Sequence, residues 1–229
     1  MNEGIPTAYP YPVPERRPWA WVTWLLVAST VAVFLLQLLG LHVYGDDVVG
    51  NALAFSGQAM AEHRYWTVLT YAWAHAVAMF GHPDLFWLHI VANMVPLICF
   101  GPALEGLLGH GRFLGLYLGG AVASALVWYV LNLQSDEPII GASGAVFAVI
   151  AAIGTAIPRV RVTVLLFFVI PLRMSMRLLA LLVCGIEVAS VLFHLMPEVA
   201  HTAHLGGAAF GFLYVVGVFG ISRREYPLA

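Results

Sequence analysis

A serine set among small residues is the first candidate for chemistry in this chain. Ser143 lies in the run Gly141-Ala142-Ser143-Gly144, which opens a short apolar segment ending at Pro158. Two interpretations are open for its hydroxyl. Gly, Ala and Ser let neighbouring membrane helices approach closely, so Ser143 could serve packing alone. A serine at a helix N-terminus, beside free backbone N–H groups, could instead act as a nucleophile.

A histidine late in the chain is suited to be the base that such a nucleophile needs. His204, Gly207 and Gly211 recur at three- and four-residue spacing, which puts them on one helix face. The histidine therefore lies on the stripe that packs closest to a neighbouring helix. A serine and a histidine within hydrogen-bond reach form a nucleophile and its activating base.

Three further polar groups lie in apolar segments. His89 and Asn93 are one helical turn apart and share a face, where they either join helices through hydrogen bonds or carry a function. Glu187 is interpreted as protonated or hydrogen-bonded to Ser190, because an unpaired buried charge is expensive. Glu105 is expected to accept hydrogen bonds from the backbone of the turn that follows it.

The composition determines the class of protein that must position these groups. Of 229 residues, 61% are hydrophobic and 10% are charged, whereas a soluble domain has about 25% charged residues. A spanning helix needs about 20 apolar residues. The chain is therefore predicted to be an all-α membrane protein with six transmembrane helices, over residues 19–39, 85–104, 113–133, 142–157, 178–195 and 203–221.

The segments between these helices are less regular. Residues 40–84 form a long outer loop, whose aromatic stretch Tyr65–His75 is expected to lie in the membrane interface. The apolar segment Val162–Leu172 is too short to span and is interpreted as an interfacial or re-entrant piece. Residues 1–18 are a Pro-rich cytoplasmic tail, residues 19–221 the membrane domain, and residues 222–229 a second cytoplasmic tail.

Arginine placement predicts the orientation. The chain has no lysine, and with both termini in the cytoplasm every arginine except Arg64 falls on the inner side. Ser143 and His204 then begin parallel helices at similar depth on the outer side. The helix of Ser143, at about 16 residues or 24 Å, is too short for the hydrocarbon core. Its start must therefore lie below the surface, under a water-filled depression.

In combination, these residues resemble the rhomboid family of intramembrane serine proteases, over about residues 19–221. The resemblance rests on His89-xxx-Asn93, on Gly141-Ala142-Ser143-Gly144, and on His204-xx-Gly207-xxx-Gly211, in this order and on these helices. It implies a six-helix bundle with a long loop between its first two helices. One departure concerns the loop, where family members commonly have Trp-Arg and this chain has Trp66-Thr67; Arg64 is a possible substitute.

The resemblance also implies the roles of the residues. Ser143 would be the nucleophile and His204 the general base, with His89, Asn93 and the Ser143 N–H as the oxyanion hole. The dyad would be supported by the ring of Phe147 and by the close-packing glycines Gly141, Gly144 and Gly207, while Glu105 matches a family glutamate. No cofactor or metal is implied. The partners would be transmembrane protein substrates and the lipid bilayer, with no nucleic acid, and the location a bacterial plasma membrane.

Three other functions are weighed against the protease. A rhomboid-like protein that binds client helices without cutting them usually lacks the serine or the histidine, and this chain has both. A metal-dependent enzyme or carrier would draw on the many outer histidines, but the sequence shows no His-Glu-xx-His pattern or paired carboxylates. A transporter is disfavoured because the two halves show no inverted repeat.

Overall fold

The computed structural model describes residues 19–78, 82–133, 135, 137–166 and 169–225. The expected tail of residues 1–18, and residues 226–229, lie outside this part of the chain. Four helices are long and apolar enough to cross a membrane: α1 (Trp21–Tyr44), α5 (Leu88–Leu108), α6 (His110–Leu131) and α8 (Met176–Phe193). A helical membrane protein is therefore confirmed, with four of the six expected spans meeting these criteria.

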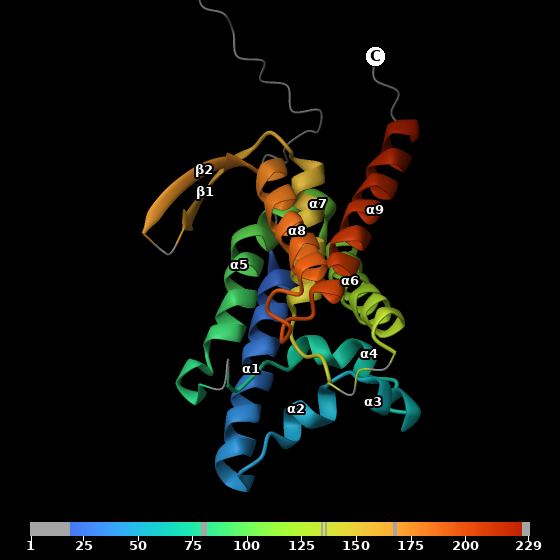
Figure 1. Cartoon of the computed structure of the whole chain (residues 1–229). Helices are drawn as coiled ribbons and strands as arrows, with labels where there is room; N and C mark the ends of the chain where they lie inside the picture. Colours follow the sequence, from blue (N-terminus) through green and yellow to red (C-terminus); the bar gives the residue numbers. More distant parts are fainter. Residues whose placement is uncertain (1–18, 79–81, 134, 136, 167–168, 226–229) are drawn as a thin grey trace, which may run out of the picture.

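The other two expected spans differ from these four in length and polarity. Helix α7 (Ser143–Ala156) has 14 residues, fewer than a spanning helix needs. Helix α9 (His201–Glu225) has 25 residues and continues past the boundary expected at residue 221. The two helices pack closely on each other, and α7 also contacts α5, α6 and α8 (Figure 1).

Helix α7 lies at the centre of the bundle because it is apolar on every side. From Gly144 to Gly154 all of its residues are buried except Phe147, as expected for a helix without a polar face. Small residues bring its neighbours close: a Cβ at Gly120 of α6 would overlap Ala148, and one at Gly154 would come 2.6 Å from Ala180 of α8. Ser143, as the first residue of this helix, is therefore held by the core of the molecule.

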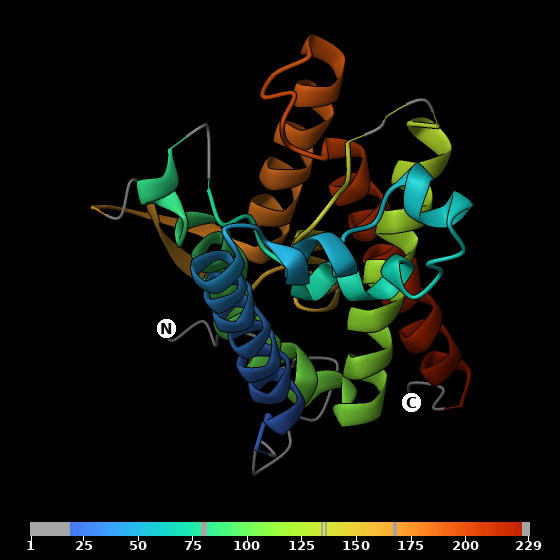
Figure 2. The same cartoon turned by 90° about the horizontal axis from the view of Figure 1, so that it is seen from below.

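The segment between α1 and α5 lies across one end of the bundle, as Figure 2 shows from below. It contains short helices α2 (Val48–Leu53), α3 (Gly57–Ala61) and α4 (Thr67–Thr70), followed by 3-10 turns η1 (Tyr71–Trp73) and η2 (Pro83–Leu85). Asp47 and Ser56 cap α2 and α3 by accepting from the N–H groups of Gly50 and Ala59 at 2.8 and 3.0 Å. Capping of this kind stabilises helices too short to form alone.

The aromatic stretch in this segment divides into two parts, which corrects the expectation that all of it lies in the interface. Tyr65 and Trp66 are more than half exposed, but Tyr71 and His75 are buried. The buried part has polar partners, since the Tyr71 hydroxyl donates to the Ala121 carbonyl at 2.8 Å. Thr67 stands where family members commonly have arginine. Its hydroxyl donates to the Arg64 carbonyl at 2.6 Å, and the residue is fully buried.

A β-hairpin includes the segment Val162–Leu172, for which an interfacial or re-entrant piece was expected. Strands β1 (Arg161–Leu166) and β2 (Ile170–Ser175) pair antiparallel, with Arg161 opposite Ser175 and Leu166 opposite Ile170. The strand β1 carries the β-branched residues that favour extended backbone. The described residues are therefore mostly helical, as expected for an all-α protein, and include one two-stranded sheet.

The Glu105 carboxylate accepts hydrogen bonds from the backbone of α1 and not from the backbone of the turn after Glu105, so the expectation for this residue was wrong. Its carboxylate accepts the N–H groups of Val22 and Thr23 at 3.0 and 2.8 Å, and the Thr23 hydroxyl at 2.6 Å. These are among the N–H groups that the start of a helix leaves without partners. The carboxylate is fully buried and also contacts His110, so it joins the starts of α1 and α6 to the end of α5.

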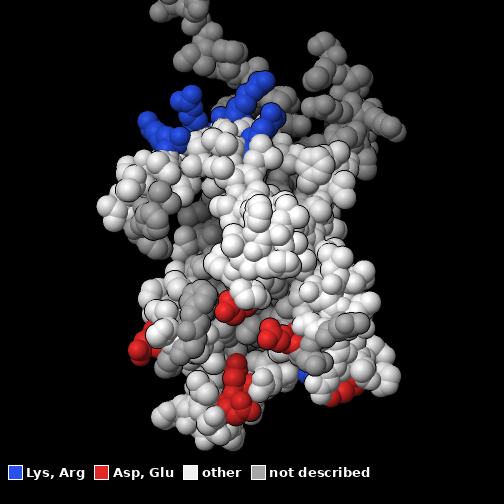
Figure 3. Space-filling view, in the orientation of Figure 1, with Lys and Arg blue, Asp and Glu red and all other residues white. Residues whose placement is uncertain are grey.

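Charged side chains separate to the two ends of the molecule. Basic side chains gather at the hairpin end, and acidic ones lie toward the end covered by the α1–α5 segment (Figure 3). The broad middle of the visible surface carries neither charge, which fits a band of lipid contact. The candidate site lies nearer the acidic end, where α7 and α9 begin.

Candidate active site

Ser143 and His204 meet where α7 and α9 start. The hydroxyl oxygen of Ser143 lies 2.7 Å from Nε2 of His204, a hydrogen-bond distance. The histidine ring is largely buried and side by side with the ring of Phe147: the two are parallel within 9°, with centroids 4.5 Å apart. Stacking of this kind fixes the plane of the imidazole. The proximity expected from the sequence is therefore present.

The meeting of the two helices depends on glycines. A Cβ at Gly207 would collide with the carbonyl oxygen of Gly144, and a Cβ at Gly144 would collide with the Ser124 hydroxyl. That hydroxyl donates to the Ala203 carbonyl at 2.7 Å and so joins α6 to the first turn of α9. The sequence indicated the two glycines but gave no sign of Ser124.

Gly207→Ala is expected to separate the first turn of α9 from α7 and to move His204 away from Ser143. Overpacking of a buried contact costs about 1–3 kcal/mol, and we expect the rate at which a fluorophosphonate labels Ser143 to fall at least about tenfold. Gly217→Ala on the same helix is the control, because a Cβ there meets nothing within 4 Å. Equal labelling rates in the two variants would contradict the importance of this contact.

A cavity of about 470 Å³ opens beside the serine and the histidine. Its lining includes Ser143, His204, Phe147 and, from α5, His89 and Asn93. This is the depression expected beside the start of the short helix. It has room for water and for a short stretch of extended peptide.

His89 presents a hydrogen-bond donor near the serine. Its Nδ1 accepts the N–H of Ala76 at 3.0 Å, so in the neutral ring the proton is on Nε2. This nitrogen lies beside Gly141, whose φ is +118° and where a Cβ would come 2.8 Å from Nε2. Glycine is therefore required at 141 both for backbone conformation and for space.

Asn93 lies one turn further along α5 and is buried. Its Nδ2 donates one hydrogen to the carbonyl of His89 at 2.8 Å, and the amide has a second hydrogen. The backbone N–H of Ser143 is in the first turn of α7, where helices lack internal acceptors. Donors from two helices thus surround the space next to the serine hydroxyl.

The α1–α5 segment holds the stretch of chain just before Ser143 in place through hydrogen bonds. The N–H of Gly141 donates to the Tyr71 carbonyl at 2.9 Å, and Phe55 pairs with Ile139 as an isolated β-bridge. His75 Nε2 accepts the N–H of Ala142 at 3.4 Å. Burial lowers the pKa of His75 to about 3, so the ring stays neutral and retains this acceptor at neutral pH.

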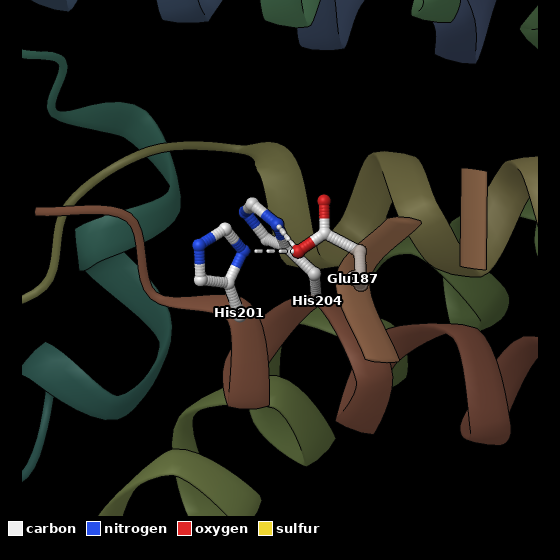
Figure 4. A group of neighbouring side chains, drawn as sticks. All are labelled: Glu187, His201 and His204. Atoms are coloured by element: carbon white, nitrogen blue, oxygen red, sulfur yellow. Dashed lines mark hydrogen bonds and ion pairs between the residues drawn. The ribbon is translucent and has the colours of Figure 1, made fainter. Parts of the chain in front are cut away.

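Glu187 has different partners from those expected, as the close-up in Figure 4 shows. Its Oε2 lies 2.6 Å from Nδ1 of His201 and 3.0 Å from Nδ1 of His204. Ser190, the partner expected from the sequence, has a buried hydroxyl with no hydrogen bond to any described residue. The sequence did contain a sign of His201, which lies three residues before His204 and therefore one helical turn away.

The fold and its cavity define a class: a helical membrane protein with a cavity lined by a serine, two histidines and an asparagine. The family can be stated from comparison with known proteins. The model of the Rhomboid domain matches residues 62–221, which is more than half of the chain. The protein therefore belongs to the rhomboid family.

The chain is also similar to curated proteins with rhomboid in their names. Presenilin-associated rhomboid-like protein A, mitochondrial, of Danio rerio is 37% identical over 62% of this chain and 37% of its own length. Its Homo sapiens counterpart is 33% identical over 61% of this chain and 36% of its own length. Rhomboid protein 1, mitochondrial, of Saccharomyces cerevisiae is 32% identical over 59% of this chain and 38% of its own length. The matched region spans well under half of these relatives.

These names correct the expected location. The sequence was interpreted as that of a bacterial plasma-membrane protein, yet the relatives above are named as mitochondrial proteins. Arginine placement predicts which end of the bundle lies on the inner side of a membrane. It does not identify the membrane. The assignment to a bacterial plasma membrane is therefore withdrawn.

Proposed function

We propose that this protein is an intramembrane serine endopeptidase in which Ser143 is the nucleophile and His204 the general base. The observation that carries the proposal is the 2.7 Å contact between Ser143 Oγ and His204 Nε2 at the wall of a cavity. The family supports it, since the resemblance noted above is to intramembrane proteases. Helices α7 and α9 would complete a six-helix bundle around the site.

The first half of the reaction forms an acyl-enzyme. His204 Nε2 takes the proton of the Ser143 hydroxyl as Oγ bonds to the scissile carbonyl carbon, and the carbonyl π electrons move to its oxygen. That oxygen would be met by the N–H of Ser143, by Nε2–H of His89 and by the free amide hydrogen of Asn93. Collapse of the intermediate breaks the C–N bond, and the proton on Nε2 passes to the leaving amine.

Water then completes hydrolysis. A water molecule in the cavity gives a proton to His204 Nε2 while its oxygen bonds to the acyl carbon. Collapse of this second intermediate breaks the bond to Ser143 Oγ, which regains the proton. The cavity supplies the water that a site within a bilayer otherwise lacks.

The substrate class follows from the surroundings of the site. A peptide bond within a helix is inaccessible to Ser143, so the substrate must be a membrane protein whose transmembrane segment unwinds locally. The cavity is lined by Asn93 and Pro96 of α5 and by Val183 of α8, and we propose entry from the lipid between these two helices. The proposed oxyanion donors, which are the N–H groups of Ser143, His89 and Asn93, then lie at the end of this path.

The test is cleavage by the purified protein in proteoliposomes that also contain a model substrate with one transmembrane segment. We expect two products by mass spectrometry, with the cut in or near that segment. A serine-reactive fluorophosphonate should stop cleavage and a chelator should not. Cleavage that a chelator abolishes, or stable binding of the substrate without any cut, would contradict the proposal.

Asn93→Ala should weaken the reaction without abolishing it. Loss of one oxyanion donor costs on the order of 3 kcal/mol, or about a hundredfold in kcat. The N–H of Ser143 and Nε2–H of His89 remain, so residual activity is expected. Steady-state kinetics of the variant test this, with a change in kcat rather than in KM as the expected sign. Full activity of Asn93→Ala would show that Asn93 is not an oxyanion donor.

A further inference from the structure

We propose that Glu187 is a positioning residue that holds His204 in the tautomer needed for catalysis, and that His201 keeps this carboxylate in place. The inference rests on the proposed protease activity and extends the serine–histidine pair by two groups from α8 and α9. All three side chains are buried, and Figure 4 shows the carboxylate between the two imidazole rings. The hydrogen-bond partners of His201 and His204 determine which ring nitrogens carry protons.

The proton positions on His201 are set by backbone carbonyls. Its Nε2 lies 2.8 Å from the Leu195 oxygen and 3.1 Å from the Met196 oxygen. Carbonyl oxygens only accept hydrogen bonds, so Nε2 carries a hydrogen. The other nitrogen, Nδ1, is 2.6 Å from Glu187 Oε2, and at this distance one proton must lie between them.

This shared proton explains how Glu187 can be buried in a membrane helix. Whether the proton rests on the imidazole or on the carboxyl group, Glu187 and His201 together carry no net charge. A neutral pair avoids the large penalty of an isolated buried carboxylate. It also leaves Oε2 with capacity to accept a second hydrogen bond.

The proton positions on His204 follow from the reaction. Its Nε2 faces Ser143 and must be free of hydrogen in order to accept the serine proton. In a neutral ring Nδ1 then carries the hydrogen. Glu187 Oε2 lies 3.0 Å from this nitrogen, although off the direction of its N–H, and no described residue makes a hydrogen bond with it. Catalytic contacts of this kind often tighten once substrate is bound.

The distances favour a proton network over a metal site, although these three residues could offer ligand atoms within 4.8 Å of one another. Zinc binds nitrogen and oxygen at about 2.0–2.2 Å with tetrahedral angles, so two of its ligand atoms lie about 3.3 Å apart. The 2.6 Å between Glu187 and His201 is shorter than this and is typical of a hydrogen bond.

Glu187 would act when His204 takes the proton of Ser143. The ring is then an imidazolium with Glu187 Oε2 3.0 Å from its Nδ1, and the attraction between the two charges resembles that in Ser-His-Asp enzymes, where loss of the acid lowers kcat by about 10⁴. Phe147 also holds the ring plane here, so we expect a smaller loss for Glu187→Gln, of about 10²–10³ in kcat.

The test compares Glu187→Gln and wild-type protein by two readouts: kcat and KM for the model substrate, and the second-order rate at which a fluorophosphonate labels Ser143. We expect kcat and the labelling rate to fall together by about 10²–10³ while KM changes less than about threefold. Ser190→Ala is the control, because Ser190 lies on the same helix with a buried hydroxyl and no described partner. It should keep wild-type values.

The labelling rate separates this inference from the proposed function, because it reports serine activation without any substrate. If the wild-type protein neither cleaves nor labels, the proposed function fails. If the wild type labels and Glu187→Gln labels at the same rate, the positioning role of Glu187 is overturned. Activity lost to a chelator and restored by zinc would overturn it in favour of a metal site.

Glu187→Asp keeps the inference testable if the Gln variant does not fold. It preserves the carboxyl group but draws it back by one methylene, away from both histidines. We expect a labelling rate between those of wild type and Glu187→Gln, and a thermal unfolding midpoint close to that of Ser190→Ala. A labelling rate equal to the wild-type rate in a folded Asp variant would overturn the proposal.

Discussion

Replacing Ser143 by alanine is expected to lower the cleavage rate by about 10⁶-fold, to the background of the assay. The substitution removes the atom that bonds to the scissile carbonyl carbon in the proposed mechanism, and it leaves the hydrogen-bond donors around it in place. Substrate binding should therefore survive, because the cavity is lined mainly by apolar side chains that the change does not touch. The measurement is single-turnover cleavage in proteoliposomes, together with co-purification of uncut substrate.

Thr155→Ala is the matched control for that variant. Thr155 lies near the other end of α7, and its hydroxyl donates to the Ala151 carbonyl within the helix. A loss confined to Ser143→Ala would therefore reflect chemistry and not damage to the helix. Cleavage by Ser143→Ala at more than a small fraction of the wild-type rate would exclude Ser143 as the nucleophile.

Replacing His204 by alanine is expected to have a comparably large effect, on the order of 10⁵–10⁶-fold. Without the imidazole nothing within 3 Å of Ser143 Oγ takes its proton among the described side chains. Because the two groups act as a unit, the double variant Ser143→Ala/His204→Ala should be no slower than either single variant. Cleavage and fluorophosphonate labelling are measured for all three.

Tyr214→Phe is the control on α9, since Tyr214 lies ten positions after His204 and its hydroxyl donates to the Arg112 carbonyl near the start of α6. It should keep the wild-type rate. The thermal unfolding midpoint is also needed for His204→Ala, because the change leaves Glu187 with His201 as its one histidine partner. A folded His204→Ala protein that still cleaves at the wild-type rate would remove His204 from the mechanism.

The pairing of serine and histidine could be predicted because it depends on local patterns. Small residues at three- and four-residue spacing mark the faces on which helices approach, and arginine placement gives the direction of each helix. Gly144 and Gly207 lie on such faces, and their helices do meet. Two parallel helices that start at similar depth then bring Ser143 and His204 together without any long-range information.

Glu187 and His201 could not be paired in the same way. Their contact requires the turn between α8 and α9, where His194 and Met196 adopt positive φ angles of 53° and 46°. Non-glycine residues rarely adopt this conformation, and nothing in their sequence predicts it. The same turn presents the carbonyls of Leu195 and Met196 to His201, so the proton network depends on irregular backbone.

The hairpin and Glu105 were missed for related reasons. Strand β1 is a short apolar run rich in β-branched residues, and periodicity alone does not tell such a run from other apolar segments. Glu105 serves N–H groups more than 80 positions earlier in the chain, a contact that no local pattern reports. The membrane in which the protein lies was also misjudged, because orientation signals are similar in different membranes.

The most direct test of Ser143 as the nucleophile is to treat the purified, active protein with a fluorophosphonate and to locate the adduct by peptide mass spectrometry. We expect one modified residue, Ser143, with adduct formation and loss of cleavage following the same time course. In His204→Ala we expect no adduct at Ser143 within that time. Loss of cleavage with the adduct on another serine, or full cleavage by protein modified at Ser143, would contradict the assignment of Ser143 as the nucleophile.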